Sequence, residues 1–135
     1  MERTMSETVN EHEHEHELIL ASRVNGTPVY NQAEERLGHI DDLSIEKISG
    51  KVKYAIMSFG GFLGIGDRFH PIPWSLLDYN IEKGGYVVPL DRAALKGAPH
   101  YDRTELRDLG GAGHRNHGEL IFGYYSPYGY VGPYW

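Results

Sequence analysis

Cysteine is absent from this 135-residue chain, and so is any long apolar run. Without cysteine the chain cannot form disulfides, thiolate metal sites or a cysteine nucleophile. No stretch approaches the roughly 20 apolar residues of a membrane-spanning helix, and the first ten residues have no apolar core of a signal peptide. We therefore expect a cytoplasmic protein of one domain, without a membrane span.

The chain also lacks a block of lysine and arginine, and its net charge is −6 at pH 7. Residues 1–17 hold one arginine and six glutamates, a balance of −5, so residues 18–135 together carry only −1. A nearly neutral body lacks the positive surface that phosphate neutralisation requires. We therefore expect no direct binding to nucleic acid or to anionic lipid.

The composition divides the chain into three parts. Residues 1–17 form a polar, acidic tail with too few apolar residues to order itself by burial. Residues 18–109 contain most of the apolar runs and are expected to form the folded domain. Residues 110–135 form a Gly- and Tyr-rich tail, whose aromatic area is expected either to dock on protein or to lower solubility.

Between these tails, short apolar runs alternate with glycine turns. The pattern predicts five or six strands, with hairpins at Ser49-Gly50 and Gly84-Gly85, and an all-β barrel or half-barrel. Ile40 is out of phase with Leu43 and Ile45, which predicts a bulge near residues 41–42. Asp91 and Gly97 are expected to cap and end one helical turn, and a second short helix is expected to end at Gly110.

The run at residues 52–59 is apolar on both faces of the strand that it predicts. Val52, Tyr54 and Ile56 share one face, and residues 55, 57 and 59 share the other. A strand that is buried on both sides needs cover beyond a single barrel core. We expect that cover to come from a tail or from another subunit.

The most glycine-rich segment is "SFGGFLGIGDRFHPIPW", residues 58–74. Its glycines at 61, 64 and 66 read in the reverse order of the dinucleotide-binding fingerprint, and no helix start follows to receive a phosphate. We interpret the segment as a connection between two strands. Pro71 and Pro73 make the second of these an edge or an irregular strand, because proline cannot donate a ladder hydrogen bond.

Three groups of residues were weighed as chemical sites. Asp67, Arg68 and His70 allow an acid–base role, but the sequence places no nucleophile near them, so a structural histidine beside a surface ion pair is favoured. A second group consists of the carboxylates of Asp41, Asp42 and Glu46, which could form a hard-cation site. A solvated acidic face is the favoured interpretation of this group.

The third group is the tract "EHEHEHE". His12, His14 and His16 can hold Zn²⁺, Ni²⁺ or Cu²⁺ weakly, either on one side of an extended chain or with His12 and His16 paired on a helix. The alternation also resembles an engineered affinity tag, and it is compatible with native sequence. The favoured interpretation is an acidic tail without a physiological metal, so no cofactor is expected.

Several segments together resemble the PRC-barrel domain family. They are "VNGTPVYN", "LGHIDDLSIEKISGKVKYAIMSFGGFLGIGDRFHPIPWSLLDYN" and "GGYVVPLDRAALKGAP", in unbroken order from about residue 22 to 102. The resemblance implies a small PRC-type β-barrel of about six strands, with short helical turns and here an aromatic C-terminal tail. Similar barrels occur in the H subunit of photosynthetic reaction centres and in RimM-type ribosome maturation factors, where they are docking modules. The chain looks most like free-standing bacterial members.

We therefore expect a non-catalytic, protein-binding module that associates with its own copy, as a dimer, and with an unidentified protein partner. The expected interface or structural anchors are Tyr54, Ile56, Phe59, Phe62, Leu63, Ile65 and Trp74. One alternative is an accessory factor in ribosome assembly or RNA processing that acts through a protein partner. The other is a small metal-dependent enzyme or sensor that uses His70, Asp67 or the histidine tract.

Overall fold

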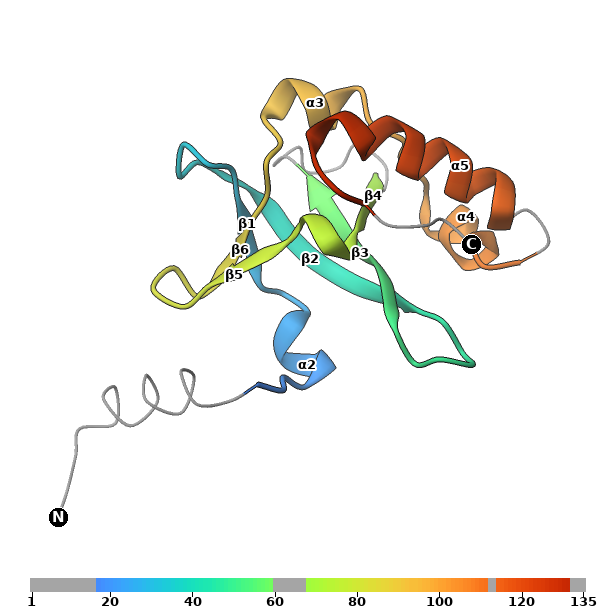
Figure 1. Cartoon of the computed structure of the whole chain (residues 1–135), viewed down its shortest axis with the longest axis horizontal. Helices are drawn as coiled ribbons and strands as arrows, with labels where there is room; N and C mark the ends of the chain where they lie inside the picture. The colour runs from blue at the N-terminus through green and yellow to red at the C-terminus, as the bar shows by residue number, and fades with distance from the viewer. Residues whose placement is uncertain (1–16, 60–67, 112–113, 132–135) are drawn as a thin grey trace, which may run out of the picture.

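The computed structural model describes residues 17–59, 68–111 and 114–131. They form six strands, four α-helices and two 3₁₀ helices (Figure 1). In chain order, these are α2 (Ala21–Val24), β1 (Pro28–Tyr30), β2 (Arg36–Ile45), β3 (Val52–Phe59), β4 (Phe69–Pro73), η1 (Trp74–Leu76), β5 (Asp78–Asn80), β6 (Gly85–Val87), α3 (Arg92–Lys96), α4 (Arg103–Asp108), α5 (His114–Tyr125) and η2 (Ser126–Tyr128).

All six strands belong to one sheet with the order β4-β3-β2-β1-β6-β5. Neighbouring strands are antiparallel except β1 and β6, which run parallel. Within the described residues, the edge strands β4 and β5 do not pair with each other, so the sheet is not closed into a barrel. The expected number of strands is confirmed, whereas the closed barrel is not.

The turns and the irregularity of the sheet follow local signals in the sequence. Gly50 and Gly84 have φ angles of +76° and +63°, which glycine adopts readily, and they lie in the β2–β3 and β5–β6 hairpins. The β2–β3 register passes from Ile40↔Met57 to Asp42↔Ile56, so one residue of β2 is extra. The bulge expected at residues 41–42 is therefore confirmed, and it turns Ile40 into the core.

The two short helices also begin as their caps predict. The Asp91 side chain accepts a hydrogen bond from the Ala94 amide at the start of α3. Asp102 and Glu105 form a reciprocal capping box at the start of α4. Each cap satisfies amides that would otherwise lack partners in the first helical turn.

Strand β3 is buried on both faces by this chain alone. Ala55 and Met57 lie opposite Leu43 and Ile40 of β2, and all of residues 54–57 are buried. On the other face, the Tyr54 ring lies 5.5 Å from the ring of Phe122, which belongs to α5. Figure 1 shows α5 lying across the end of the sheet that holds β3 and β4.

Helix α5 is a departure from the sequence analysis, which expected an aromatic tail after residue 110. Ile121, Phe122 and Tyr125 of this helix are buried in the core. Glycine at 118 and 123 lowers the intrinsic helix propensity of the segment, so the helix depends on this packing. Of the two sources of cover that the sequence allowed for residues 52–59, the structure uses the C-terminal segment.

Candidate functional site

Of the residues expected as interface or structural anchors, the four that the structure describes are buried or half-buried within this chain. Tyr54 and Ile56 lie in the core beneath α5. Trp74 is half-buried, with its ring 5.6 Å from that of Tyr86, and Phe59 is half-buried with its ring edge-on to His70. Phe62, Leu63 and Ile65 lie outside the described residues.

His70 sits inside the sheet on β4, opposite Met57 of β3. Its side chain is 2% exposed, and its Nδ1 atom has no hydrogen-bond partner among the described residues. Burial, with smaller contributions from the nearby His100 and Arg68, lowers the pKa of His70 to about 4, against a backbone hydrogen bond with Pro99 that raises it. The imidazole is therefore neutral at physiological pH.

The acid–base group proposed from the sequence is not assembled by the described residues. Arg68 is exposed, whereas His70 points into the core. Asp67, the third member, lies outside the described residues. What the structure places beside His70 is His100, with a ring-centroid separation of 5.6 Å.

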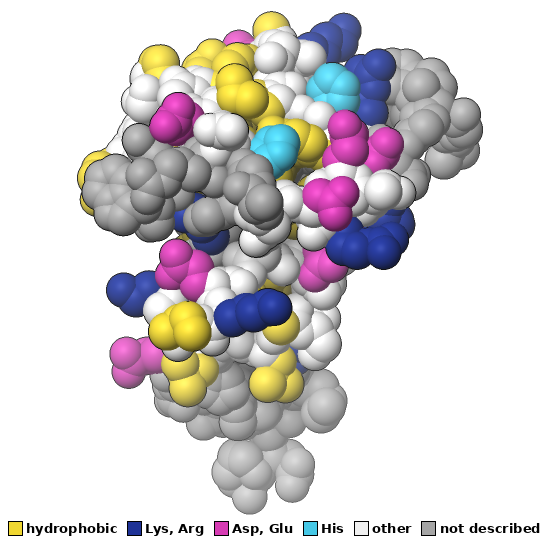
Figure 2. Space-filling model, turned by 90° about the vertical axis from the view of Figure 1, so that its right-hand side faces the viewer, with side chains coloured by type: hydrophobic (Ala, Val, Ile, Leu, Met, Phe, Trp, Pro, Cys, Tyr) yellow, Lys and Arg dark blue, Asp and Glu magenta, His cyan; other side chains and the backbone are white. Residues whose placement is uncertain are grey.

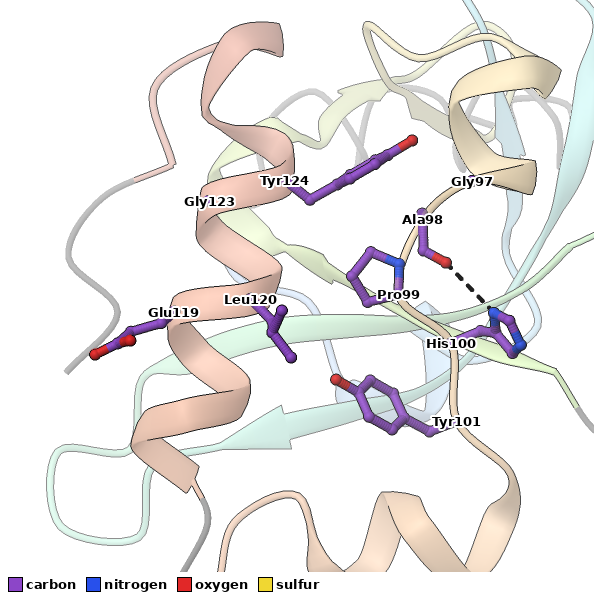
Figure 3. Close-up of a pocket in the computed structure, with 9 residues that line it drawn as sticks. All are labelled: Gly97, Ala98, Pro99, His100, Tyr101, Glu119, Leu120, Gly123 and Tyr124. Atoms are coloured by element: carbon purple, nitrogen blue, oxygen red, sulfur yellow. Dashed lines mark hydrogen bonds between the residues drawn. The ribbon is translucent and has the colours of Figure 1, made fainter.

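His100 lies in the loop between α3 and α4 and is exposed. This loop is tied to β4 by two backbone hydrogen bonds of 2.9 Å between Phe69 and Tyr101. His100 Nδ1 lies 3.4 Å from the Ala98 carbonyl oxygen, as the dashed line in Figure 3 marks. The sequence analysis missed His100, because its only local signal is an isolated histidine 30 positions from His70.

A hollow of about 710 Å³ lies between α5 and the loop of residues 97–101. Figure 3 shows Leu120 and Tyr124 of α5 facing Pro99 and Tyr101 across it, while Glu119 points away. The Tyr124 hydroxyl donates a hydrogen bond to the Ala94 carbonyl and so ties α5 to α3. The hollow is lined mainly by apolar groups.

A second hollow, of about 480 Å³, lies beneath the β2–β3 hairpin, against Leu109 and Gly110. We call the outer part of this hairpin, residues 44–53, the hairpin surface. Ile48 at its tip is fully exposed and Ile45 is about half exposed. In the lower half of the face in Figure 2, hydrophobic side chains lie beside lysine or arginine side chains.

The hairpin surface is also positively charged. Its three lysines, at 47, 51 and 53, outnumber its one carboxylate, Glu46. Burial lowers the pKa of the Lys53 ammonium, and Glu46 opposes that shift. Beneath it, Tyr54 lines the hollow, and its buried hydroxyl has no hydrogen-bond partner in the part of the chain that the structure describes.

The three acidic residues considered as a cation site each interact with different partners. Asp41 lies 3.7 Å from Arg103 and 4.0 Å from His39, and Asp42 accepts a hydrogen bond from the Leu43 amide. Glu46 accepts one from the Ser49 hydroxyl. Across the described ranges, no three or more His, Asp or Glu side chains form a metal-binding group. His12, His14 and His16 lie outside these ranges.

Among the described residues, no helix combines the length and the apolar composition needed to cross a membrane.

Comparisons with known proteins identify the fold. A family model described as PRC-barrel domain matches residues 16–95, more than half of the chain. No curated protein matches. A solved structure described as a 16S ribosomal RNA processing protein RimM, from Pseudomonas aeruginosa, is 20% identical with a TM-score of 0.38, and the match covers 59% of this chain and 48% of that one. The present chain thus spans about half the length of that protein. On the strength of the family match, the chain belongs to the PRC-barrel domain family.

Proposed function

We propose that this chain is a non-catalytic assembly module that binds protein through the hairpin surface, and that its first partner is a second copy of itself. The observation that supports this proposal is the fully exposed Ile48 beside the half-exposed Ile45, above a hollow and among lysines. Apolar side chains at the centre of a polar rim are the usual composition of a protein interface.

The N-terminal end of the chain complements the hairpin surface, which supports a second copy as the partner. Residues 1–17 carry a charge of −5 and run into Leu18, Ile19 and Leu20, all three of which are exposed. We call residues 1–20 the N-terminal arm. An acidic segment that ends in apolar residues complements a basic hairpin with apolar residues at its tip, in both charge and hydrophobicity. The apolar faces of β3 no longer support self-association, because this chain buries both of them, one of them beneath α5.

The test compares two exposed apolar positions. Ile48→Asp places a charge at the tip of the hairpin surface, and Leu120→Asp places one on α5, where Leu120 is 62% exposed. Sedimentation equilibrium at micromolar concentration should show a concentration-dependent dimer for the wild type and for L120D, and a monomer for I48D. A single 15.3 kDa species for the wild type at every concentration would reject self-association.

The alternative of a ribosome-assembly role uses the same surface with a different partner. The lysines of the hairpin surface favour an acidic partner, and the −1 charge of residues 18–135 favours a protein over RNA. Capture of ribosomal proteins by the wild type and not by I48D, from cells of the source organism, would favour this role. Capture of the wild-type chain alone would favour self-assembly.

A further inference from the structure

We propose that His70 and His100 together bind one divalent transition-metal cation of the Zn²⁺ class. The proposal is independent of the assembly function, because neither ring belongs to the hairpin surface. It rests on the separation of the two rings, on the partners of their nitrogen atoms, and on the way in which the chain holds them together.

The ring separation fits a shared ion. A Zn–N bond of about 2.0–2.1 Å, plus roughly 1.1 Å from the nitrogen to the ring centre, puts each centroid about 3.2 Å from a bound ion. Two centroids that are 5.6 Å apart then subtend an angle of about 120° at the ion. This angle lies close to the tetrahedral value that zinc prefers.

The hydrogen bonds of both rings follow the arrangement of metal-ligating histidines. Such a histidine usually donates one ring N–H to a carbonyl or carboxylate and binds the metal with the other nitrogen. Within the described part of the chain, the Nδ1 atom of His70 has no hydrogen-bond partner. The bond between His70 and the Pro99 backbone, which has only a carbonyl to offer, therefore belongs to Nε2. His100 places Nδ1 near the Ala98 carbonyl oxygen, which leaves Nε2 as the ligating atom.

The backbone holds the two histidines in register. His70 is fixed in β4 next to Phe69, and His100 precedes Tyr101, so the paired amides and carbonyls of Phe69 and Tyr101 join the two segments directly beside the rings. The ring of Phe59 packs edge-on against His70 and excludes water on that side. The exposed His100 leaves the remaining coordination positions open to water or to a further ligand.

The local charges affect the expected affinity of the two histidines for the cation. The neutral form of His70 is the form that ligates a metal, and burial maintains it. The exposed guanidinium of Arg68 acts on His70 and repels a cation. With two protein ligands and this repulsion, the affinity should lie well below that of four-ligand structural zinc sites.

The experiment uses the full chain with His12→Asn, His14→Asn and His16→Asn, because the tract would compete for metal. Co²⁺ is titrated while the visible d–d absorption is followed, and Zn²⁺ is then added in competition. We expect one ion per chain, an intense tetrahedral Co²⁺ spectrum and displacement by Zn²⁺. Removing the repulsion with Arg68→Gln should tighten binding by roughly two- to fivefold.

Two further variants in the same background decide the assignment. His100→Ala, at an exposed position, should abolish the tetrahedral spectrum, while His39→Ala on β2 should leave it unchanged. His70→Gln should also abolish the tetrahedral spectrum, and circular dichroism checks that this variant folds. If H70Q does not fold, the result for H100A decides the assignment. The proposal is overturned if the chain with the three tract histidines replaced binds no Co²⁺, if binding survives in H100A, or if R68Q binds more weakly.

Discussion

Gly38 in β2 lies so close to β3 that no other residue fits there. A Cβ atom at this position would be 1.9 Å from the Ser58 carbonyl oxygen, a backbone atom that cannot move without shifting the ladder. Gly123 on α5 is the opposite case, because a Cβ there meets no described residue within 4 Å. The same amino acid thus permits close strand packing at one position and weakens a helix at the other.

Replacing each of these two glycines with alanine should change the free energy of unfolding in opposite directions. Gly38→Ala should lower the free energy of unfolding by about 1–3 kcal/mol or more, because the strands must separate. Gly123→Ala should raise it by roughly 0.5–1 kcal/mol through helix propensity alone. Urea denaturation of both variants against the wild type measures the difference. Equal effects of the two changes would contradict the close approach of β2 and β3.

At the scale of elements, the strands, turns and caps could be predicted because their signals are local. Gly50 at a hairpin, Asp91 at a helix start and the phase slip after Ile40 each act within a few residues. Helix α5 could not be predicted in this way, because its stability comes from burying Phe122 against Tyr54, some 70 residues earlier in the sequence.

The candidate sites, too, could be predicted only from residues that are close in the sequence. The sequence singled out His70 and placed Asp67 and Arg68 beside it, because neighbours in sequence were the only neighbours visible. The partner that the structure supplies is His100, brought there by the bridge between Phe69 and Tyr101. Interface anchors such as Ile56 were chosen for their apolar character, which cannot distinguish a core from an interface.

One buried and one exposed position on α5 test whether this helix is part of the core. Phe122→Ala removes a buried ring and should lower the free energy of unfolding by about 3–5 kcal/mol, whereas Leu120→Ala, at a 62% exposed position, should change it by less than about 0.5 kcal/mol. Urea denaturation followed by tyrosine and tryptophan fluorescence measures both. A small effect of F122A would show that α5 does not hold the sheet together.

On the scale of the whole molecule, the first buried side chain among the described residues belongs to α2. Val24 is buried there, and the Gly26 amide donates a hydrogen bond to the Ile40 carbonyl. Leu18, Ile19 and Leu20 before it are exposed. We therefore expect the proposed dimer, and not the fold of one chain, to depend on the N-terminal arm.

Deleting residues 1–17 should separate these two roles. At low protein concentration the melting temperature should stay within about 5 °C of the wild type, because residues 1–17 hold few apolar side chains that burial could stabilise. At micromolar concentration the truncated chain should sediment as a monomer. A larger fall in melting temperature would mean that the arm packs against its own chain. An unchanged dimer would mean that copies associate through another surface.

The position of α5 in the chain also affects biosynthesis. The ribosome releases the sheet first, from β1 to β6, and the helix that covers Tyr54 and Ile56 follows later. A nascent chain thus holds an uncovered apolar sheet face until the residues through Tyr125 have left the exit tunnel. Translation pauses or premature termination within residues 88–113 would prolong that exposure, so truncated products should require chaperone binding or rapid proteolysis.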